Sequence, residues 1–80
     1  MDTITAIKER ILHLCAERDI SINKLATLSA LPPSSVKNIL YGRSVDTKIL
    51  TIKKMCDGLD ITLAEFFATP EFDALEQEIK

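Results

Sequence analysis

The sequence predicts an all-α fold: a bundle of five short helices followed by a C-terminal helical extension. Apolar residues recur at steps of three and four along most of the chain, which is the spacing of one face of a helix. Proline, glycine and helix-capping residues separate these segments, and no stretch alternates apolar and polar residues as a half-buried strand does. The 80 residues are enough for one small domain, which we place at residues 1–69, with the extension at 70–80.

The composition argues against a metal site, a cofactor site and a membrane segment. Cys15, Cys56 and the single histidine, His13, occur without a CxxC pair, which is a poor basis for metal ligation. We therefore expect buried thiols in a reducing compartment and no cofactor. No apolar run approaches the ~18 residues of a membrane span, and the amino end carries no apolar signal-peptide core. The sequence thus predicts a cytoplasmic protein.

The net charge of −2 is unevenly distributed along the chain. Residues 1–31 are neutral overall. Residues 32–56 hold five basic residues and one acidic residue, whereas residues 57–80 hold one basic and seven acidic residues. Because a polyanion such as DNA attracts a basic surface and repels an acidic one, the middle of the chain is the candidate for phosphate contact and the C-terminal end is not.

The first two helices are predicted at residues 3–18 and 22–29. Asp2 or Thr3 can cap the start of the first helix, and Ser21 is a suitable N-cap for the second. The first helix carries an amphipathic stripe with the spacing of a buried face, formed by Ile4, Ile7, Ile11 and Leu14.

The third predicted helix, residues 33–41, has the pattern of a helix that docks in a DNA groove. Pro33 suits its first position, because the N–H that proline lacks would have no partner there. Gly42 is expected to end it in the left-handed conformation. One face is apolar, and the others carry small hydrogen-bonding side chains and one cation, which are Ser34, Ser35, Lys37 and Asn38.

Two further helices are predicted at residues 48–57 and 63–68. An aspartate–glycine pair at 57–58 is expected to close the first of them. Thr62 and Glu65 match a capping box at the start of the second. The inner face of the helix at 48–57 is predicted to hold Ile49, Ile52, Met55 and Cys56.

The C-terminal extension is predicted to be a helix over residues 70–79. Thr69 and Pro70 supply an N-cap and a proline at the first helical position. Because so short a helix is not stable alone in water, its apolar stripe must dock on its own domain or on a second copy. That stripe consists of Phe72, Leu75 and Ile79.

From about Arg10 to Phe67, the ordered set of these features resembles the Cro/cI-type helix-turn-helix family, the lambda-repressor-like DNA-binding domains. The resemblance implies a lambda-repressor-like bundle that binds double-stranded DNA sequence-specifically through the third helix. It further implies a small transcriptional regulator, a repressor, of bacterial, phage or mobile-element origin. The residues that carry the resemblance are Ser21, Leu25, Ala26, Leu31, Val36, Ile39, Gly42, Ile49, Ile52, Met55 and the segment Leu59–Thr62.

Several positions depart from the family pattern. Ala30 stands where glycine is frequent at the turn, and a left-handed alanine costs about 1 kcal/mol. Ile22 and Pro33 stand where members often carry a backbone-clamping glutamine and a polar base reader, so those contacts are lost or moved. Cys15 and Leu40 replace an arginine–glutamate pair. Because replacement of both partners by apolar groups is tolerated, we expect these two side chains to face each other between the first and third helices.

The resemblance and the polar positions together predict the DNA contacts. Asn38 is the expected base reader, because a carboxamide can bond N6 and N7 of adenine together. Lys37 is expected to reach guanine or a phosphate, and Asn23 to compensate in part for the missing glutamine. The complete predicted set is Ser21, Asn23, Ser34, Ser35, Lys37, Asn38, Arg43, Ser44 and Lys48.

A reading helix rich in serine discriminates weakly, so useful specificity predicts a homodimer on two half-sites. We expect the copies to pair through a surface near Phe66, Phe67 and Phe72. A protein-interaction module and an antitoxin, which would bind both a toxin and DNA, remain as alternatives with the same fold. An enzyme is not predicted, because the sequence has no glycine-rich phosphate loop and no catalytic motif, and no small-molecule substrate is evident.

Overall fold

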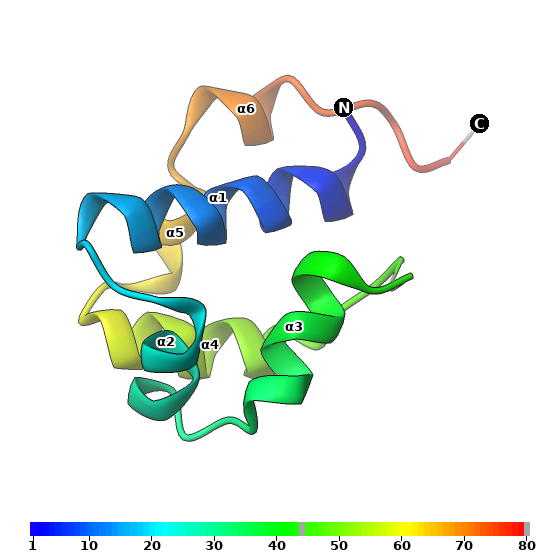
Figure 1. Ribbon diagram of the computed structural model, residues 1–80. Coiled ribbons are helices and arrows are strands. Elements are labelled where there is room, and N and C mark those ends of the chain that lie inside the picture. Colours follow the sequence, from blue (N-terminus) through cyan, green and yellow to red (C-terminus); the bar gives the residue numbers. More distant parts are fainter. Residues whose placement is uncertain (44, 80) are drawn as a thin grey trace.

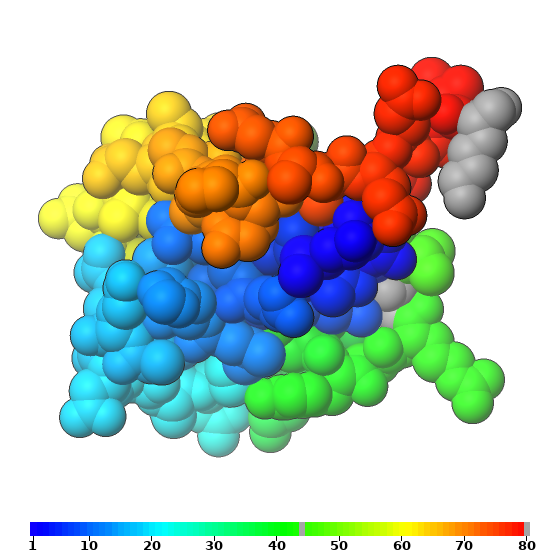
Figure 2. All heavy atoms as spheres, turned by 90° about the horizontal axis from the view of Figure 1, so that it is seen from above, coloured from blue at the N-terminus to red at the C-terminus, as the bar shows by residue number. Residues whose placement is uncertain are grey.

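The computed structural model describes residues 1–43 and 45–79, and over that range the chain forms six α-helices and no strand. The α1 helix lies across the middle of the molecule, with α6 on one side and α2, α3 and α4 on the other (Figure 1). Seen from above, α1 runs between the C-terminal segment and α3 (Figure 2). The helices are α1 (Thr3–Glu17), α2 (Ile22–Leu28), α3 (Pro33–Tyr41), α4 (Ile49–Leu59), α5 (Leu63–Phe67) and α6 (Pro70–Asp73).

One cluster of buried apolar side chains forms the core and draws on five of the helices, α1 to α5. The closest helix pairs are α2 with α3 and α4, α4 with α5, and α1 with α6. Cys15 and Leu40 are both buried in this cluster, as predicted, and a direct contact between them stays a prediction. Burial raises the pKa of both cysteine thiols, so they remain neutral packing groups near pH 7. The cluster contains Ile7, Ile11, Leu14, Cys15, Leu25, Ala26, Val36, Ile39, Leu40, Ile52, Met55, Cys56, Leu59 and Phe66.

Helices α1, α2 and α4 end in the same way, each with a non-glycine residue in the left-handed region. These residues are Asp19, Ala30 and Asp60, with φ of 52°, 54° and 56°. After α2, the N–H of Ala30 donates to the carbonyl of Thr27 at 3.2 Å and the N–H of Leu31 donates to that of Ala26 at 2.9 Å. This is the paired bonding of a Schellman motif, and the same pairs follow α1 and α4.

The residue after each left-handed position is apolar and packs against the core. These residues are Ile20, Leu31 and Ile61, each partly buried. Such an apolar contact commonly accompanies the Schellman motif, because the reversed chain is directed back onto the helix it has just left. The left-handed Ala30 predicted from the sequence is therefore confirmed, and it is one of three equivalent helix ends.

Both glycines differ from the sequence expectation. Gly42 was expected to be left-handed, but its φ of −85° and ψ of −171° are extended. Glycine is required there because a Cβ would lie 2.5 Å from the carbonyl oxygen of Asn38. Gly58 does not end α4, which continues to Leu59, because the left-handed residue is Asp60. A Cβ on Gly58 would lie 2.8 Å from the Leu28 carbonyl, so this glycine lets α4 approach the end of α2.

The short helix α5 is fixed at both ends. At its start, Thr62 Oγ1 accepts from the N–H of Glu65 and Glu65 Oε1 accepts from that of Thr62, each at 3.0 Å, which confirms the predicted capping box. At its end, Arg10 Nε donates to the Phe66 carbonyl at 2.7 Å and Nη2 donates to that of Glu65 at 2.9 Å. The guanidinium also lies over the Phe66 ring, 5.9 Å from its centroid.

The C-terminal helix is shorter than predicted. It ends at Asp73, not at residue 79, and of its apolar stripe only Phe72, which is partly buried, packs against the core. The Phe72 ring packs against Phe67 and Phe66, with centroids 4.9 and 6.2 Å apart, whereas Ile79 is 86% exposed. A stretch without burial cannot sustain so short a helix. The segment therefore docks on its own domain through Phe72.

Beyond α6 the tail returns to the amino end as an irregular segment. The terminal ammonium of Met1 lies 3.4 Å from Glu76 Oε1, and Thr3 Oγ1 donates to Glu78 Oε2 at 2.8 Å. Both contacts are exposed, and exposed polar pairs of this kind contribute at most about 1 kcal/mol each. They place acidic side chains beside the start of α1.

Candidate DNA-binding surface

The centre of the site is the pair α2 and α3 with the turn between them. Pro32 is extended, with φ of −60° and ψ of 139°, and Pro33 occupies the first helical position of α3, as predicted. No side chain caps the start of α3. Together with the left-handed Ala30, the two prolines turn the chain sharply after α2, so the segment forms a helix-turn-helix.

The α3 helix divides into an inner and an outer face, as the sequence predicted. Its inner face is held in the core by Val36, Ile39 and Leu40, which are at most 7% exposed. The predicted reading residues lie on the outer side. Ser34, Lys37 and Asn38 are exposed and Ser35 is half-buried, so polar groups of the helix are presented to solvent.

Two predicted phosphate contacts lie at the start of α2. Ser21 caps this helix, and its Oγ accepts from the N–H of Lys24 at 3.0 Å. The hydroxyl proton of Ser21 is still available to a phosphate oxygen, because a hydroxyl both accepts and donates. Asn23, in the first turn, is exposed. Ile22 is half-buried against the core and takes no polar role.

All three of the predicted cationic contacts remain available to a polyanion. Lys37, Arg43 and Lys48 are exposed, and within residues 1–43 and 45–79 none of them forms an ion pair. Lys53, in contrast, pairs with Asp57 on α4, and the hydrogen bond that its Nζ donates to this carboxylate raises the pKa of Lys53. The predicted contact at Ser44 lies outside the described residues.

The sequence analysis missed that four apolar side chains at or between the end of α3 and the first turn of α4 are exposed, which are Tyr41, Val45, Ile49 and Leu50. Ile49 was predicted on the inner face of α4, which is wrong: it is the first residue of the helix and is 57% exposed. The exposure of Leu50 could have been predicted from the sequence. Leu50 precedes Lys53 and Lys54 by three and four positions, so it lies on the same face of the helix as these two exposed lysines.

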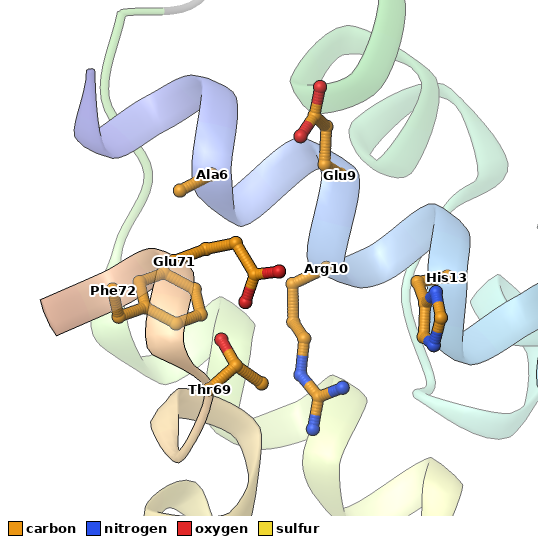
Figure 3. Close-up of a pocket in the computed structure, with 7 residues that line it drawn as sticks. All are labelled: Ala6, Glu9, Arg10, His13, Thr69, Glu71 and Phe72. Atoms are coloured by element: carbon orange, nitrogen blue, oxygen red, sulfur yellow. The ribbon is translucent and has the colours of Figure 1, made fainter. Parts of the chain in front are cut away.

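A pocket of about 190 Å³ lies between α1 and α6, away from α3 (Figure 3). The side chains of Arg10, Glu71 and Thr69 converge on it, and Phe72 forms one wall. Arg10 is already engaged by the carbonyls at the end of α5, and His13 bonds Glu17 at 2.9 Å on the surface. We therefore interpret the pocket as a gap in the packing between α1 and α6, and not as part of the candidate DNA-binding surface.

Within the part of the chain that the structure describes, no helix is long and apolar enough to cross a membrane. Over the same residues, no group of three or more His, Cys, Asp or Glu side chains is placed to hold a metal ion.

Comparison with known proteins agrees with this geometry. The Cro/C1-type HTH DNA-binding domain family matches residues 10–71, which include the helix-turn-helix and extend into α6. Among solved structures, the crystal structure of the prophage Lp1 protein 11 is similar, with a TM-score of 0.80 and 33% sequence identity. The similarity covers 94% of this chain and 100% of that chain. No curated protein is significantly similar. The chain belongs to the Cro/C1-type helix-turn-helix family of DNA-binding domains.

Proposed function

We propose that this protein binds double-stranded DNA sequence-specifically and acts as a small transcriptional repressor in the cytoplasm. The observation that carries the proposal is the two-sided α3 helix. Its apolar side is anchored in the core, while its polar side is presented to solvent together with three cations that form no ion pair within the described residues. An α-helix of this kind fits the major groove, where base edges can be read.

Each predicted contact residue within the described range then has a role at the DNA. Asn38, on the outer face of α3, reads a base, and Ser34 and Ser35 in the first turn reach base edges or phosphates. Lys37 reaches guanine or a phosphate. The start of α2 meets the backbone through Ser21 and Asn23, and the segment after α3 does so through Arg43 and Lys48.

The small size of the reading face supports binding as a homodimer. One bidentate base contact gives about 1–3 kcal/mol of discrimination, and a two-fold pair of modules doubles the number of bases read. An origin in a phage or mobile element is supported by the similarity to a prophage protein.

The test is selection of bound sites from random duplex DNA, repeated with two variants. Asn38→Ala should relax the preference at one base pair and leave the others unchanged. Arg43→Ala should weaken binding to all sequences alike and reduce the dependence of log K on log salt by about one unit. Gln77→Ala and Lys54→Ala, an exposed carboxamide and an exposed lysine outside the proposed contacts, are the matched controls. An unchanged consensus with Asn38→Ala would show that α3 does not read DNA in this register.

A second candidate function is a protein-interaction module or an antitoxin. The exposure of Tyr41, Val45, Ile49 and Leu50 favours it, because contact with DNA alone does not require four exposed apolar side chains. Salt dependence separates the two functions: release of counterions from DNA gives a steep slope, whereas association with a protein through apolar side chains does not.

A further inference from the structure

The segment after α6 is held to the rest of the molecule by exposed polar contacts. Residues 74–79, here called the acidic tail, form no helix and carry Glu76 and Glu78. Glu76 pairs with the amino terminus at 3.4 Å, and Glu78 accepts from Thr3 Oγ1 at 2.8 Å. Phe72, just before the tail, packs among the phenylalanines and keeps this end attached. Because exposed contacts contribute at most about 1 kcal/mol each, the tail can leave the start of α1 without unfolding of the core.

Where the acidic tail docks, Glu78 lines the same groove as the segment that follows α3. The groove has a volume of about 520 Å³, and its lining includes the start of α1 together with Val45, Asp46 and Thr47. Figure 2 shows the red end of the chain at the blue amino terminus, with the green segment after α3 beside it. A carboxylate of the tail is thus held close to residues 45–47.

Two of the proposed phosphate contacts adjoin this segment. Lys48 follows Thr47 directly and Arg43 precedes Val45 by two positions, so the Cα atoms of each pair are at most about 4 and 8 Å apart. Both cationic side chains are exposed. Because exposed charges act on one another over about 10 Å at 0.1 M salt, a carboxylate docked at this groove weakens the attraction of the two cations for phosphate.

We propose that the docked acidic tail lowers the affinity of this protein for DNA, an inference that rests on the proposed DNA binding. Docking places negative charge beside cations that meet phosphates, and a bound duplex brings phosphates toward the carboxylates of the tail. The docked tail and bound DNA therefore disfavour each other. Because such coupling is reciprocal, DNA also releases the tail from the start of α1. The effect is independent of base sequence, since every duplex presents the same phosphates.

The first test removes the charges of the tail and keeps its hydrogen-bond acceptors. The variant is Glu76→Gln/Glu78→Gln, in which a carboxamide at position 78 can still accept from Thr3. The control, Glu9→Gln/Glu71→Gln, changes the net charge equally at the pocket between α1 and α6. At 0.1 M salt the tail variant should bind a selected and a scrambled duplex about threefold more tightly than the wild type. The control should stay within about 1.5-fold, because charges more than about 10 Å away are screened. An equal gain in both variants, or none in the tail variant, would overturn the proposal.

The second test loosens the tail and keeps its charges. Thr3→Val removes the hydroxyl that bonds Glu78, and Thr5→Val, also in the first turn of α1, is the matched control. Thr3→Val should bind both duplexes about twofold more tightly, in keeping with the loss of one exposed bond, and Thr5→Val should not. In the ¹⁵N-labelled wild type, the backbone heteronuclear NOE of residues 76–79 should fall when either duplex is added. Unchanged affinity in Thr3→Val, or an unchanged NOE on DNA, would show that docking of the tail does not oppose DNA binding.

The wild type itself separates this inference from the proposed function. Its binding to duplex DNA, with a steep dependence on salt, tests the proposed function without reference to the tail. No binding by the wild type would overturn the proposed function and this inference together. Equal affinities of the wild type and the two tail variants would overturn this inference alone.

Discussion

At the ends of helices in this chain, the backbone conformation of single residues departs from what their residue types favour. Asp19, Ala30 and Asp60 each take a left-handed conformation that favours glycine. The two glycines are not left-handed; each lies where a Cβ would be too close to a backbone carbonyl. The sequence revealed the strained position at Ala30 through its place in the turn. It could not reveal why Gly42 and Gly58 are glycines, because the atoms that exclude a Cβ, on Asn38 and Leu28, are set by the fold.

Replacing Ala30 by glycine should stabilise the protein. The left-handed conformation costs alanine about 1–2 kcal/mol, whereas the greater freedom of glycine in the unfolded chain costs about 0.4–1 kcal/mol. We expect the free energy of unfolding in urea to rise by about 0.5–1 kcal/mol. The matched control, Ala16→Gly within α1, should lower it by about 1 kcal/mol. A loss of stability in Ala30→Gly would contradict the conformational explanation.

Helices are the scale at which the sequence was most informative. The bounds of α3 follow from a proline at its start and a glycine after its end, both local signals, and the structure reproduces residues 33–41. The extent of α6 depends on contacts with α1 and α5, which no local pattern reports. For the same reason the sequence did not indicate that Arg10 bonds the end of α5, more than fifty positions away.

Arg10 should contribute to stability through these bonds to α5. Arg10→Gln removes a charged donor from the carbonyls of Glu65 and Phe66, and we expect the free energy of unfolding to fall by about 2 kcal/mol. Arg10→Lys should recover part of this loss, because lysine keeps the charge but not the paired geometry. Arg18→Gln, at an exposed position, should change the value by no more than about 0.5 kcal/mol. If Arg10→Gln and Arg18→Gln lowered the free energy of unfolding equally, the bonds from Arg10 to the end of α5 would have no specific role in stability.

The tail should divide at α6 into a stabilising part and a dispensable part. Truncation after Ala74 keeps Phe72 and removes only the irregular segment, so the free energy of unfolding should fall by less than about 1 kcal/mol. Truncation after Thr69 also removes the Phe72 contact with Phe66 and Phe67 and should cost about 2 kcal/mol. Thermal unfolding followed by circular dichroism measures both. If the two truncations were equally stable, Phe72 would have no part in the core.

At the scale of the whole molecule, basic and acidic residues are concentrated in different parts of the chain. The basic middle of the chain supplies Lys37 on α3 and Arg43 and Lys48 after it, while the acidic tail returns to the start of α1. The sequence established this gradient and the polar face of α3. It did not establish that Tyr41, Val45, Ile49 and Leu50 are exposed, because the exposure of Ile49 depends on where α4 meets its neighbours.

The most direct test of DNA binding is titration of a selected duplex and a scrambled duplex at several salt concentrations. Contacts from Lys37, Arg43 and Lys48 predict a slope of log K against log salt of about −2.7 per bound copy, since each neutralised phosphate contributes about −0.9. The two duplexes should show similar slopes, and the selected one should bind at least about 10³-fold more tightly at every salt concentration. A slope near zero, or equal affinity for both duplexes, would contradict sequence-specific DNA binding by this surface.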